Sequence, residues 1–290
     1  MIFGIDIASV AGNKNPNWTK AKATGPISFA LIRSNFGTAP DKAFARDWPR
    51  LKRAGLVRGA YLFLRFPRNG KPAPTPEAQA AAAIGTIGAL DDGDLPPALD
   101  VEFPGAGRSE TGLSAQECLD DVRAAWRALS EHYRVAPIIY TSARVWRDDL
   151  GNAPADDLIE SPLWLARYFF KAGPAARDPS AFESGKLDPP VPPPWGDAGN
   201  WWIHQYQGDA TKFPGFTAKV DMNRFNVAFR GARGARVGWA QRRLGIAETG
   251  RFDPATEAAV RAFQDDNDLV SDGVIGPRTF AHLARRPSID

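Results

Sequence analysis

The 290-residue sequence has few of the side chains that bind metals or act as nucleophiles, with one cysteine and three histidines. A single cysteine, Cys118, excludes an intrachain disulfide, so we expect the core alone to hold the fold. The histidines His132, His204 and His282 are far apart and lack metal-ligand spacing, which argues against a zinc amidase or zinc peptidase. We therefore expect neither a metal nor a cofactor.

Other absences exclude further classes of protein. There is no G-x-S-x-G elbow, no P-loop and no Gly-rich dinucleotide turn. The net charge of +3 is too weak and diffuse for a nucleic-acid-binding surface. The N-terminus has no basic segment and no long apolar run, so we expect no signal peptide and no membrane insertion. We expect a monomer that is made in the cytoplasm.

What the sequence does contain is a series of short apolar runs separated by helix-like stretches. This alternation predicts βα units with a parallel sheet, and eight runs in about 225 residues match a compact TIM-like (β/α)8 barrel of the α/β class. The runs are Phe3–Ile7, Phe29–Arg33, Gly59–Phe63, Ala98–Glu102, Ile138–Thr141, Leu163–Tyr168, Trp202–Tyr206 and Val220–Asn223. Helices are expected at Phe44–Ala54 and after a capping box formed by Ser114 and Glu117.

Two further segments divide the chain. The proline-rich segment Lys186–Asn200 is interpreted as a stiff loop before the seventh strand. The Gly- and Arg-rich segment Arg230–Arg236 is interpreted as a linker, so that residues 1–229 form the barrel and residues 237–290 a second domain. This tail contains a weak repeat, Thr249–Thr256 and Ser271–Thr279, in which proline opens a helix each time. The tail therefore predicts a small domain of three short helices.

Four acids lie at or near the ends of predicted strands, which is where barrel enzymes carry their active sites. Asp100 and Glu102 are two residues apart on one strand and point to the same face. Asp6 and Asp221 are on the first and last strands, which are neighbours in a closed barrel. We therefore expect all four carboxylates at one mouth of the barrel.

Such crowding has a chemical consequence, because like charges in a partly dry pocket raise the pKa of at least one acid. A protonated acid beside an ionised one is what cleavage of a glycosidic bond requires. The alternative is that these acids form ion pairs with Arg33 or Arg167, or cap helices. Aromatic side chains suited to stacking on sugars also lie in or beside the strands, although core packing is an alternative role for about half of them. These aromatics are Tyr61, Tyr140, Trp164, Tyr168, Trp202 and Tyr206.

Several short motifs resemble those of the glycoside hydrolase family 25 lysozymes, in the order of that family. They are Gly4-Ile-Asp6, Ile32-Arg33 with Gly37, Gly59-Ala-Tyr61, Leu99-Asp-Val-Glu102, Tyr140-Thr141, Trp164-Leu-Ala-Arg-Tyr168, Gln205-Tyr206 and Val220-Asp-Met-Asn223. The resemblance implies an N-acetylmuramidase that cleaves the β-1,4 bond between N-acetylmuramic acid and N-acetylglucosamine. It implies Glu102 as proton donor, Asp6 or Asp221 as the stabiliser of the cationic centre, and Asp100 as a group that orients the substrate or tunes Glu102. Substrate-binding residues would be Arg33, Tyr61, Tyr140, Trp164, Tyr168 and Gln205.

The sequence departs from that family at Ala8, Ala11 and Leu62, where Ser, Gln and His are usual. The tail is similar to the peptidoglycan-binding domain 1 family at Trp239–Leu244, Ala258–Gln264 and Asp272–Thr279. The implied partner is bacterial peptidoglycan, and the implied place of action is the bacterial cell wall. A lytic enzyme of this kind resembles a phage endolysin made in the host cytoplasm and released with the help of a holin.

Two alternatives remain open at this point. A wall-binding protein that has lost catalysis is motivated by the three departures. A chitinase-like glycosidase shares the Asp-x-Glu at a strand end but has a longer run of acids upstream, where this chain has Leu95-Pro-Pro-Ala-Leu99.

Overall fold

The computed structural model describes residues 1–182, 187–196 and 198–286. Eight strands form a closed barrel in the order β1, β10, β9, β7, β6, β5, β4, β2, and β2 pairs again with β1. These strands are β1 (Ile2–Ile7), β2 (Ile27–Phe36), β4 (Val57–Phe63), β5 (Ala98–Asp100), β6 (Ile138–Thr141), β7 (Leu163–Ala166), β9 (Ile203–Thr211) and β10 (Val220–Phe225). Two short strands outside the ring, β3 (Ala39–Pro40) and β8 (Gly173–Pro174), pair with β2 and β9. All eight predicted strands are therefore confirmed, and the barrel closes as expected.

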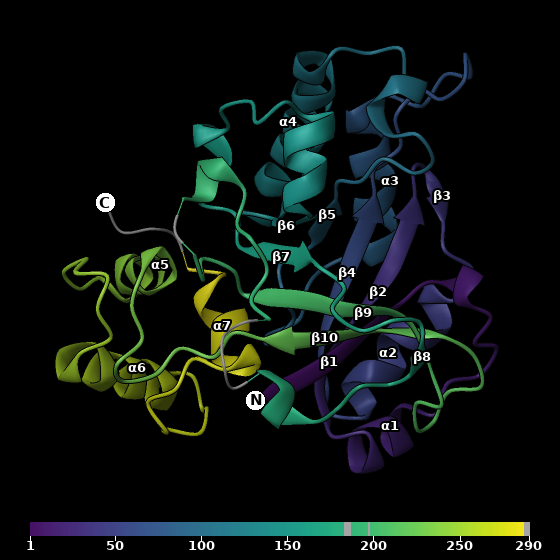
Figure 1. Cartoon of the computed structure of the whole chain (residues 1–290). Coiled ribbons are helices and arrows are strands. Elements are labelled where there is room, and N and C mark those ends of the chain that lie inside the picture. Colours follow the sequence, from purple (N-terminus) through teal and green to yellow (C-terminus); the bar gives the residue numbers. More distant parts are fainter. Residues whose placement is uncertain (183–186, 197, 287–290) are drawn as a thin grey trace.

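The prediction of an entirely parallel sheet is wrong for the last strand. β10 pairs antiparallel with both of its neighbours, β1 and β9 (Figure 1). β9 ends at Thr211 and β10 begins at Val220, so the connection is too short for a crossover, which takes a dozen residues or more. The chain instead returns through a hairpin, and the barrel is mixed.

Helices accompany only the first half of the barrel. The structure has α1 (Trp18–Thr24), α2 (Phe44–Arg53), α3 (Pro76–Ile87) and α4 (Ala115–Tyr133), all before β6. Among the described residues, the later connections have only short turns of 3-10 or π helix, so the expected helix after every strand is not present. The short turns of the whole barrel are Ser9–Ala11, Gly107–Glu110, Val145–Asp149, Asp156–Leu158, Pro179–Phe182 and Pro193–Trp195.

The helix signals of the first half are confirmed by local hydrogen bonds. α2 covers the predicted segment, and Ser114 and Glu117 form the reciprocal capping box at the start of α4. Pro193–Trp195 makes a 3-10 turn within the proline-rich loop, whereas Lys186 and Asp197 of that predicted loop lie outside the described residues.

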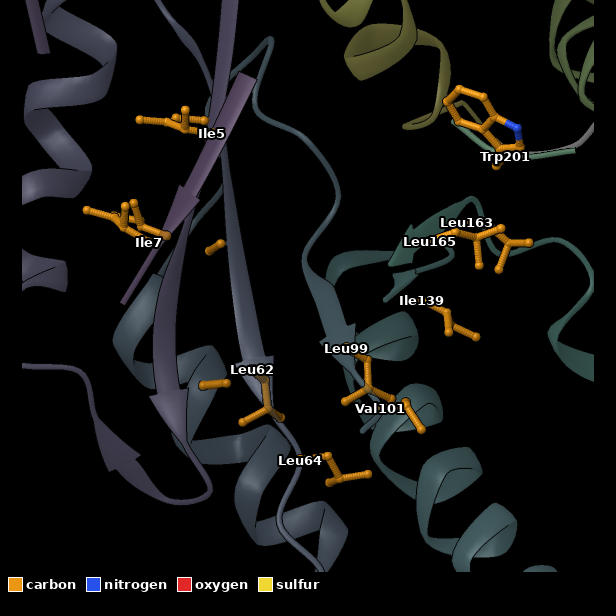
Figure 2. Close-up of a cluster of buried hydrophobic side chains, with 14 of the residues drawn as sticks. Ile5, Ile7, Leu62, Leu64, Leu99, Val101, Ile139, Leu163, Leu165 and Trp201 are labelled. Carbon is orange, nitrogen blue, oxygen red and sulfur yellow. The ribbon is translucent and has the colours of Figure 1, made fainter. Parts of the chain in front are cut away.

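Because side chains alternate along each strand, the barrel strands contribute to two separate cores. Figure 2 shows apolar side chains such as Ile5, Ile7 and Leu62 in the outer core, which lies between the strands and the helices. Asp6 and Tyr61, which alternate with these residues, instead face the barrel interior and its mouth. The same alternation that buries the apolar set therefore directs the polar set toward one cavity.

The C-terminal segment forms the three predicted helices, α5 (Ala235–Leu244), α6 (Pro254–Asp266) and α7 (Pro277–Leu283), and the last four residues, 287–290, lie outside the described residues. Proline opens α6 and α7. The predicted repeat is visible as a repeated hydrogen-bond pattern. Gln241 on α5 donates to the hydroxyl of Thr256 fifteen residues later, and Gln264 on α6 donates in the same way to Thr279. Each glutamine thereby anchors the turn that leads into the next helix.

The three helices pack on the end of the barrel where the parallel strands begin. Trp202, Phe225, Trp239 and Phe280 belong to one buried cluster that joins the barrel to the helices. The Phe280 ring lies 4.7 Å from Trp202 and 5.5 Å from Phe225, and Figure 1 places α7 beside the N-terminus. Ala228 bridges Ile275 just before the predicted linker, and α5 begins inside it. Of the described helices, none is both long and apolar enough to cross a membrane.

Candidate active site

One cavity of about 510 Å³ lies at the mouth of the barrel, opposite the C-terminal helices. Its size is within the range of small-molecule sites. Ten of its lining side chains are the ten residues predicted from the sequence: Asp6, Arg33, Tyr61, Asp100, Glu102, Tyr140, Trp164, Tyr168, Gln205 and Asp221. The structure therefore brings the whole predicted set together, while the role of each residue stays a prediction.

The barrel places the four acids in two pairs, and the members of each pair are neighbours. Asp6 on β1 lies directly opposite Asp221 on β10 in the antiparallel register. Asp100 is the last residue of β5, and Glu102 follows two residues after the strand has ended. Glu102 therefore lies beyond the end of β5, whereas we predicted it within the strand. Its backbone does not pair with a neighbouring strand. Among the described residues, its carboxyl group accepts no hydrogen bond from the protein.

Asp6 is almost fully buried and is held by side-chain amides. Its Oδ2 accepts hydrogen bonds from Gln205 Nε2 at 2.8 Å and from Asn223 Nδ2 at 2.7 Å. The hydroxyl groups of Tyr140 and Tyr168 both donate to Gln205 Oε1, each at 2.8 Å. These bonds orient the amide of Gln205 so that its NH2 group faces Asp6.

Asn223 is a site residue that the sequence analysis did not assign. Its Oδ1 accepts a hydrogen bond from Trp164 Nε1 at 2.7 Å, so its NH2 group is turned toward Asp6. The available signal was the strand period, because Asn223 is two residues after Asp221 and faces the same side of β10.

Arg33 does not pair with any of the four acids. Its Nη2 lies 2.9 Å from Oδ2 of the buried Asp41, which also accepts hydrogen bonds from the backbone and the hydroxyl of Ser9. Arg167 is exposed and forms no ion pair with the described residues, so the alternative role of the acids as its partners is not supported. Asp41 is a second residue that we missed, because it positions Arg33 from a loop with no strand pattern.

Burial raises the pKa of all four acids, and repulsion from another acid of the group adds to it for Asp6, Asp100 and Glu102. Burial is the largest cause in each case; Asp221 adds to it for Asp6 and for Glu102, and Glu102 adds to it for Asp100. For Asp221, burial raises the pKa to about 6, although the backbone N–H of Asp209 donates to Oδ1 at 2.6 Å and opposes the shift. One Asp100 oxygen is buried without a partner in the described part of the chain, which further disfavours its charged form. The raised pKa values favour the protonated acid that we predicted beside ionisable neighbours, and its identity stays a prediction.

The predicted aromatics divide between the cavity and the core. Tyr61, Tyr140 and Trp164 are buried, and the two tyrosine rings pack edge-to-face against the Trp164 ring. Together they form the floor of the cavity. Tyr168 is 55% exposed and is the member with a free face for a sugar ring. Two others lie away from the cavity: Trp202 belongs to the contact with the C-terminal helices, and Tyr206 is in the outer core.

The three departures from the family pattern differ in importance. Ala8 and Ala11 line the cavity, so they remove polar contacts there. Leu62 is buried in the outer core, because it alternates with Tyr61 and Phe63 along β4. The change from histidine to leucine at this position therefore leaves the lining of the cavity unchanged.

The raised pKa of Asp221 predicts a stability gain on removing the charge. Well below pH 3.8 the carboxyl is neutral in the folded and the unfolded chain, whereas above about pH 6 its ionisation favours the unfolded chain. The difference between 3.8 and about 6 corresponds to about 3 kcal/mol, since one pKa unit equals about 1.36 kcal/mol. Asp221→Asn keeps an acceptor for the Asp209 N–H, and we expect it to raise the free energy of unfolding by about 1–3 kcal/mol at pH 7.

Chemical denaturation at pH 7 and at pH 4 measures this difference. The gain is expected to shrink to a small fraction of its pH 7 value at pH 4. The exposed Asp265→Asn on α6 serves as the matched control, with no gain expected at either pH. A gain that is equal at both pH values would contradict an electrostatic origin.

The chain is similar in sequence to known cell-wall hydrolases. Residues 5–216 match the family model of the glycosyl hydrolases family 25, and residues 233–283 match that of a peptidoglycan binding domain. Lysozyme M1 from Streptomyces globisporus is 29% identical over 231 residues, which cover 78% of this chain and 68% of that protein.

Solved structures give the same picture. The bacterial lysozyme from Streptomyces coelicolor superposes with a TM-score of 0.62 at 26% identity, covering 78% of this chain and 92% of that one. A muramidase from Acremonium alcalophilum gives a TM-score of 0.60 at 26% identity, covering 78% and 93% of the two chains.

Proposed function

Because this chain belongs to the glycosyl hydrolases family 25, we propose that its barrel cleaves the β-1,4 bond between N-acetylmuramic acid and N-acetylglucosamine in bacterial peptidoglycan. The chain is a glycoside hydrolase of the lysozyme type that carries a peptidoglycan-binding domain. The observation that supports the proposed reaction best is the convergence of four acids, all with raised pKa, on one sugar-sized cavity.

Glu102 is the proton donor in this proposal. Its carboxyl group lies at the cavity and accepts no hydrogen bond within the described residues, so it is free to reach the glycosidic oxygen. Burial and the nearby Asp221 keep its pKa raised, which favours the protonated form before the reaction. Donation of this proton lets the leaving sugar depart as an alcohol. Water then supplies the hydroxyl of the new reducing end, and its remaining proton returns to the Glu102 carboxylate.

Asp6 and Asp221 stabilise the positive charge that develops at the sugar ring. Amide donors fix the Asp6 carboxylate, and the Asp209 N–H fixes one oxygen of Asp221. A charge held in place before the reaction needs no reorganisation when the oxocarbenium-like centre forms. Asp100 has no such donors to one of its oxygens, and its proximity to Glu102 suits the role of tuning that acid.

The C-terminal domain attaches the enzyme to the wall in this proposal. It is docked at the end of the barrel away from the cavity, so it holds peptidoglycan without blocking the active site. Action at the bacterial cell wall follows from the proposed substrate. Release by a holin, as for a phage endolysin, and a monomeric state stay predictions from the sequence.

We expect a bell-shaped pH dependence of kcat/KM. Activity falls as the pH drops through the pKa of Asp221 at about 6, because its stabilising charge is lost. Activity falls again as the pH rises through the raised pKa of Glu102, because the donor loses its proton. In Asp221→Asn the alkaline limb of the residual activity is expected to move to lower pH, because the repulsion from Asp221 that helps to raise the pKa of Glu102 is gone. An alkaline limb that does not move would contradict the assignment of Glu102.

A turbidity assay on purified walls tests the proposed function against its alternatives. The proposal expects clearing of the suspension together with the release of reducing sugars. A wall-binding protein without catalysis would sediment with the walls and clear nothing, and a chitinase-like glycosidase would release reducing sugars from chitin oligomers faster than from walls.

A further inference from the structure

A second pocket of about 270 Å³ opens beside the acid cavity. We call it the arginine pocket, and the lining residues that matter here are Glu102, Tyr140, Thr141, Arg144, Arg167 and Tyr168. Glu102, Tyr140 and Tyr168 line both this pocket and the acid cavity. A group attached to a sugar at the site of cleavage therefore reaches the arginine pocket without leaving the enzyme surface.

Two guanidinium groups line this pocket, and each keeps donors that no carboxylate of the described residues accepts. Arg144 is 57% exposed, and its nearest carboxylate is Asp149 at 3.5 Å. Arg167 is exposed, lies with its guanidinium 5.6 Å from the Phe169 ring, and forms no ion pair within the described ranges. Two other arginines near the mouth are bound to acids, since Arg33 pairs with Asp41 at 2.9 Å and Arg68 with Glu110 at 2.5 Å.

The floor of the pocket adds an unused polar group. Thr141 is 1% exposed, and its Oγ1 has no hydrogen-bond partner in the described part of the chain. An unpaired buried hydroxyl costs free energy unless a ligand or water satisfies it. Thr141 is the last residue of β6 and lies on a rigid element, so the pocket is built to accept a polar ligand.

Charge is segregated between the two cavities. The acid cavity contains four carboxylates, which suits a developing cation. The arginine pocket contains two guanidinium groups and one acid, Glu102, whose raised pKa favours its neutral form. A substrate that fits both cavities is uncharged at the bond that breaks and carries a negative charge a short distance to one side.

We propose that the arginine pocket binds a carboxylate of the peptide that is attached to the muramyl residue at the cleavage site. This inference rests on the proposed function, because it needs a muramyl sugar in the acid cavity. The muramyl residue carries its peptide on a lactyl side group, and free carboxylates of such peptides match the two guanidinium donors. The enzyme therefore recognises peptide-bearing glycan in preference to bare glycan.

The test compares Arg144→Gln, Arg167→Gln and the double variant with the unchanged enzyme on two substrates. One is peptide-bearing peptidoglycan, and the other is the same glycan after an amidase has removed the peptides. A charge-assisted hydrogen bond is worth about 1.5–3 kcal/mol, so we expect the double variant to lose about tenfold or more in kcat/KM on peptide-bearing glycan. Arg144 also lowers the pKa of Glu102, so each enzyme is assayed at its own pH optimum, where the kcat/KM on peptide-free glycan is expected to be unchanged.

A control variant and a modified substrate show whether the loss comes from the contact between the arginines and the peptide carboxylates. Arg147→Gln is the matched control, because Arg147 is 62% exposed and pairs with Asp148 outside the pocket. Amidation of the peptide carboxylates is expected to reduce the kcat/KM of the unchanged enzyme to that of the double variant. Equal losses on both substrates would overturn the proposal, because the arginines would then act through Glu102 or bind the sugars. No loss on either substrate would also overturn it, whereas failure of the unchanged enzyme to cleave either glycan would refute the proposed function itself.

Discussion

Glu102→Gln is expected to reduce kcat on peptidoglycan by a factor of about 10²–10⁴, the usual contribution of general acid catalysis. Glutamine has nearly the same shape but carries no acidic proton, so the leaving oxygen departs unprotonated. The C-terminal domain is at the other end of the barrel, and sedimentation with purified walls is expected to be unchanged. Because Glu102 accepts no hydrogen bond among the described residues and its charge is disfavoured by burial, the variant is expected to be at least as stable as the original chain.

Release of reducing sugars from walls measures this effect. Glu131→Gln is the matched control, since Glu131 is exposed on α4 and its substitution makes the same chemical change away from the cavity. Unchanged turnover in Glu102→Gln would exclude Glu102 as the proton donor. A loss of activity accompanied by a loss of folding would be detected by thermal unfolding of the same sample.

Phe280→Ala is expected to lower the free energy of unfolding of the whole chain by about 3–5 kcal/mol, the usual cost of removing a buried phenylalanine ring. Phe280 is completely buried and lies between Trp202 and Phe225 of the barrel and Trp239 of α5. These contacts make one core out of two segments that the sequence presents as separate domains. We therefore expect the barrel and the C-terminal helices to unfold in a single transition.

Denaturant unfolding, followed by tryptophan fluorescence and by loss of activity, measures this coupling. Phe229→Ala is the control, because that ring is 55% exposed and its removal is expected to change stability by less than about 0.5 kcal/mol. Two separate transitions, with the barrel transition unaffected by Phe280→Ala, would contradict the view that the helices stabilise the barrel.

The site was predictable from the sequence because its acids follow strands, and strands were detectable as short apolar runs. Asp6, Asp100 and Asp221 each belong to such a run, and the closure of the ring brings the first and last strands together. The period of two along a strand then indicated which side chains share a face. This reasoning needed no knowledge of loop conformation.

The features that were missed depend on tertiary contacts. Asp41 lies outside the strands, so no pattern indicated that it would hold Arg33. The direction of β10 depends on a short hairpin, which the apolar pattern alone did not distinguish from a crossover. Trp202, which lies just before β9, was grouped with the sugar-binding aromatics. Its actual role is to pack against Trp239 and Phe280 of the C-terminal helices, a contact that the strand pattern does not indicate.

The identity of the new reducing end is the measurement that tests the central claim most directly. Digested walls are reduced with borohydride and hydrolysed, and the amino-sugar alcohols are separated. The account predicts muramitol, since the bond broken is the one on the reducing side of N-acetylmuramic acid. Glucosaminitol, or the absence of any reduced sugar, would contradict it.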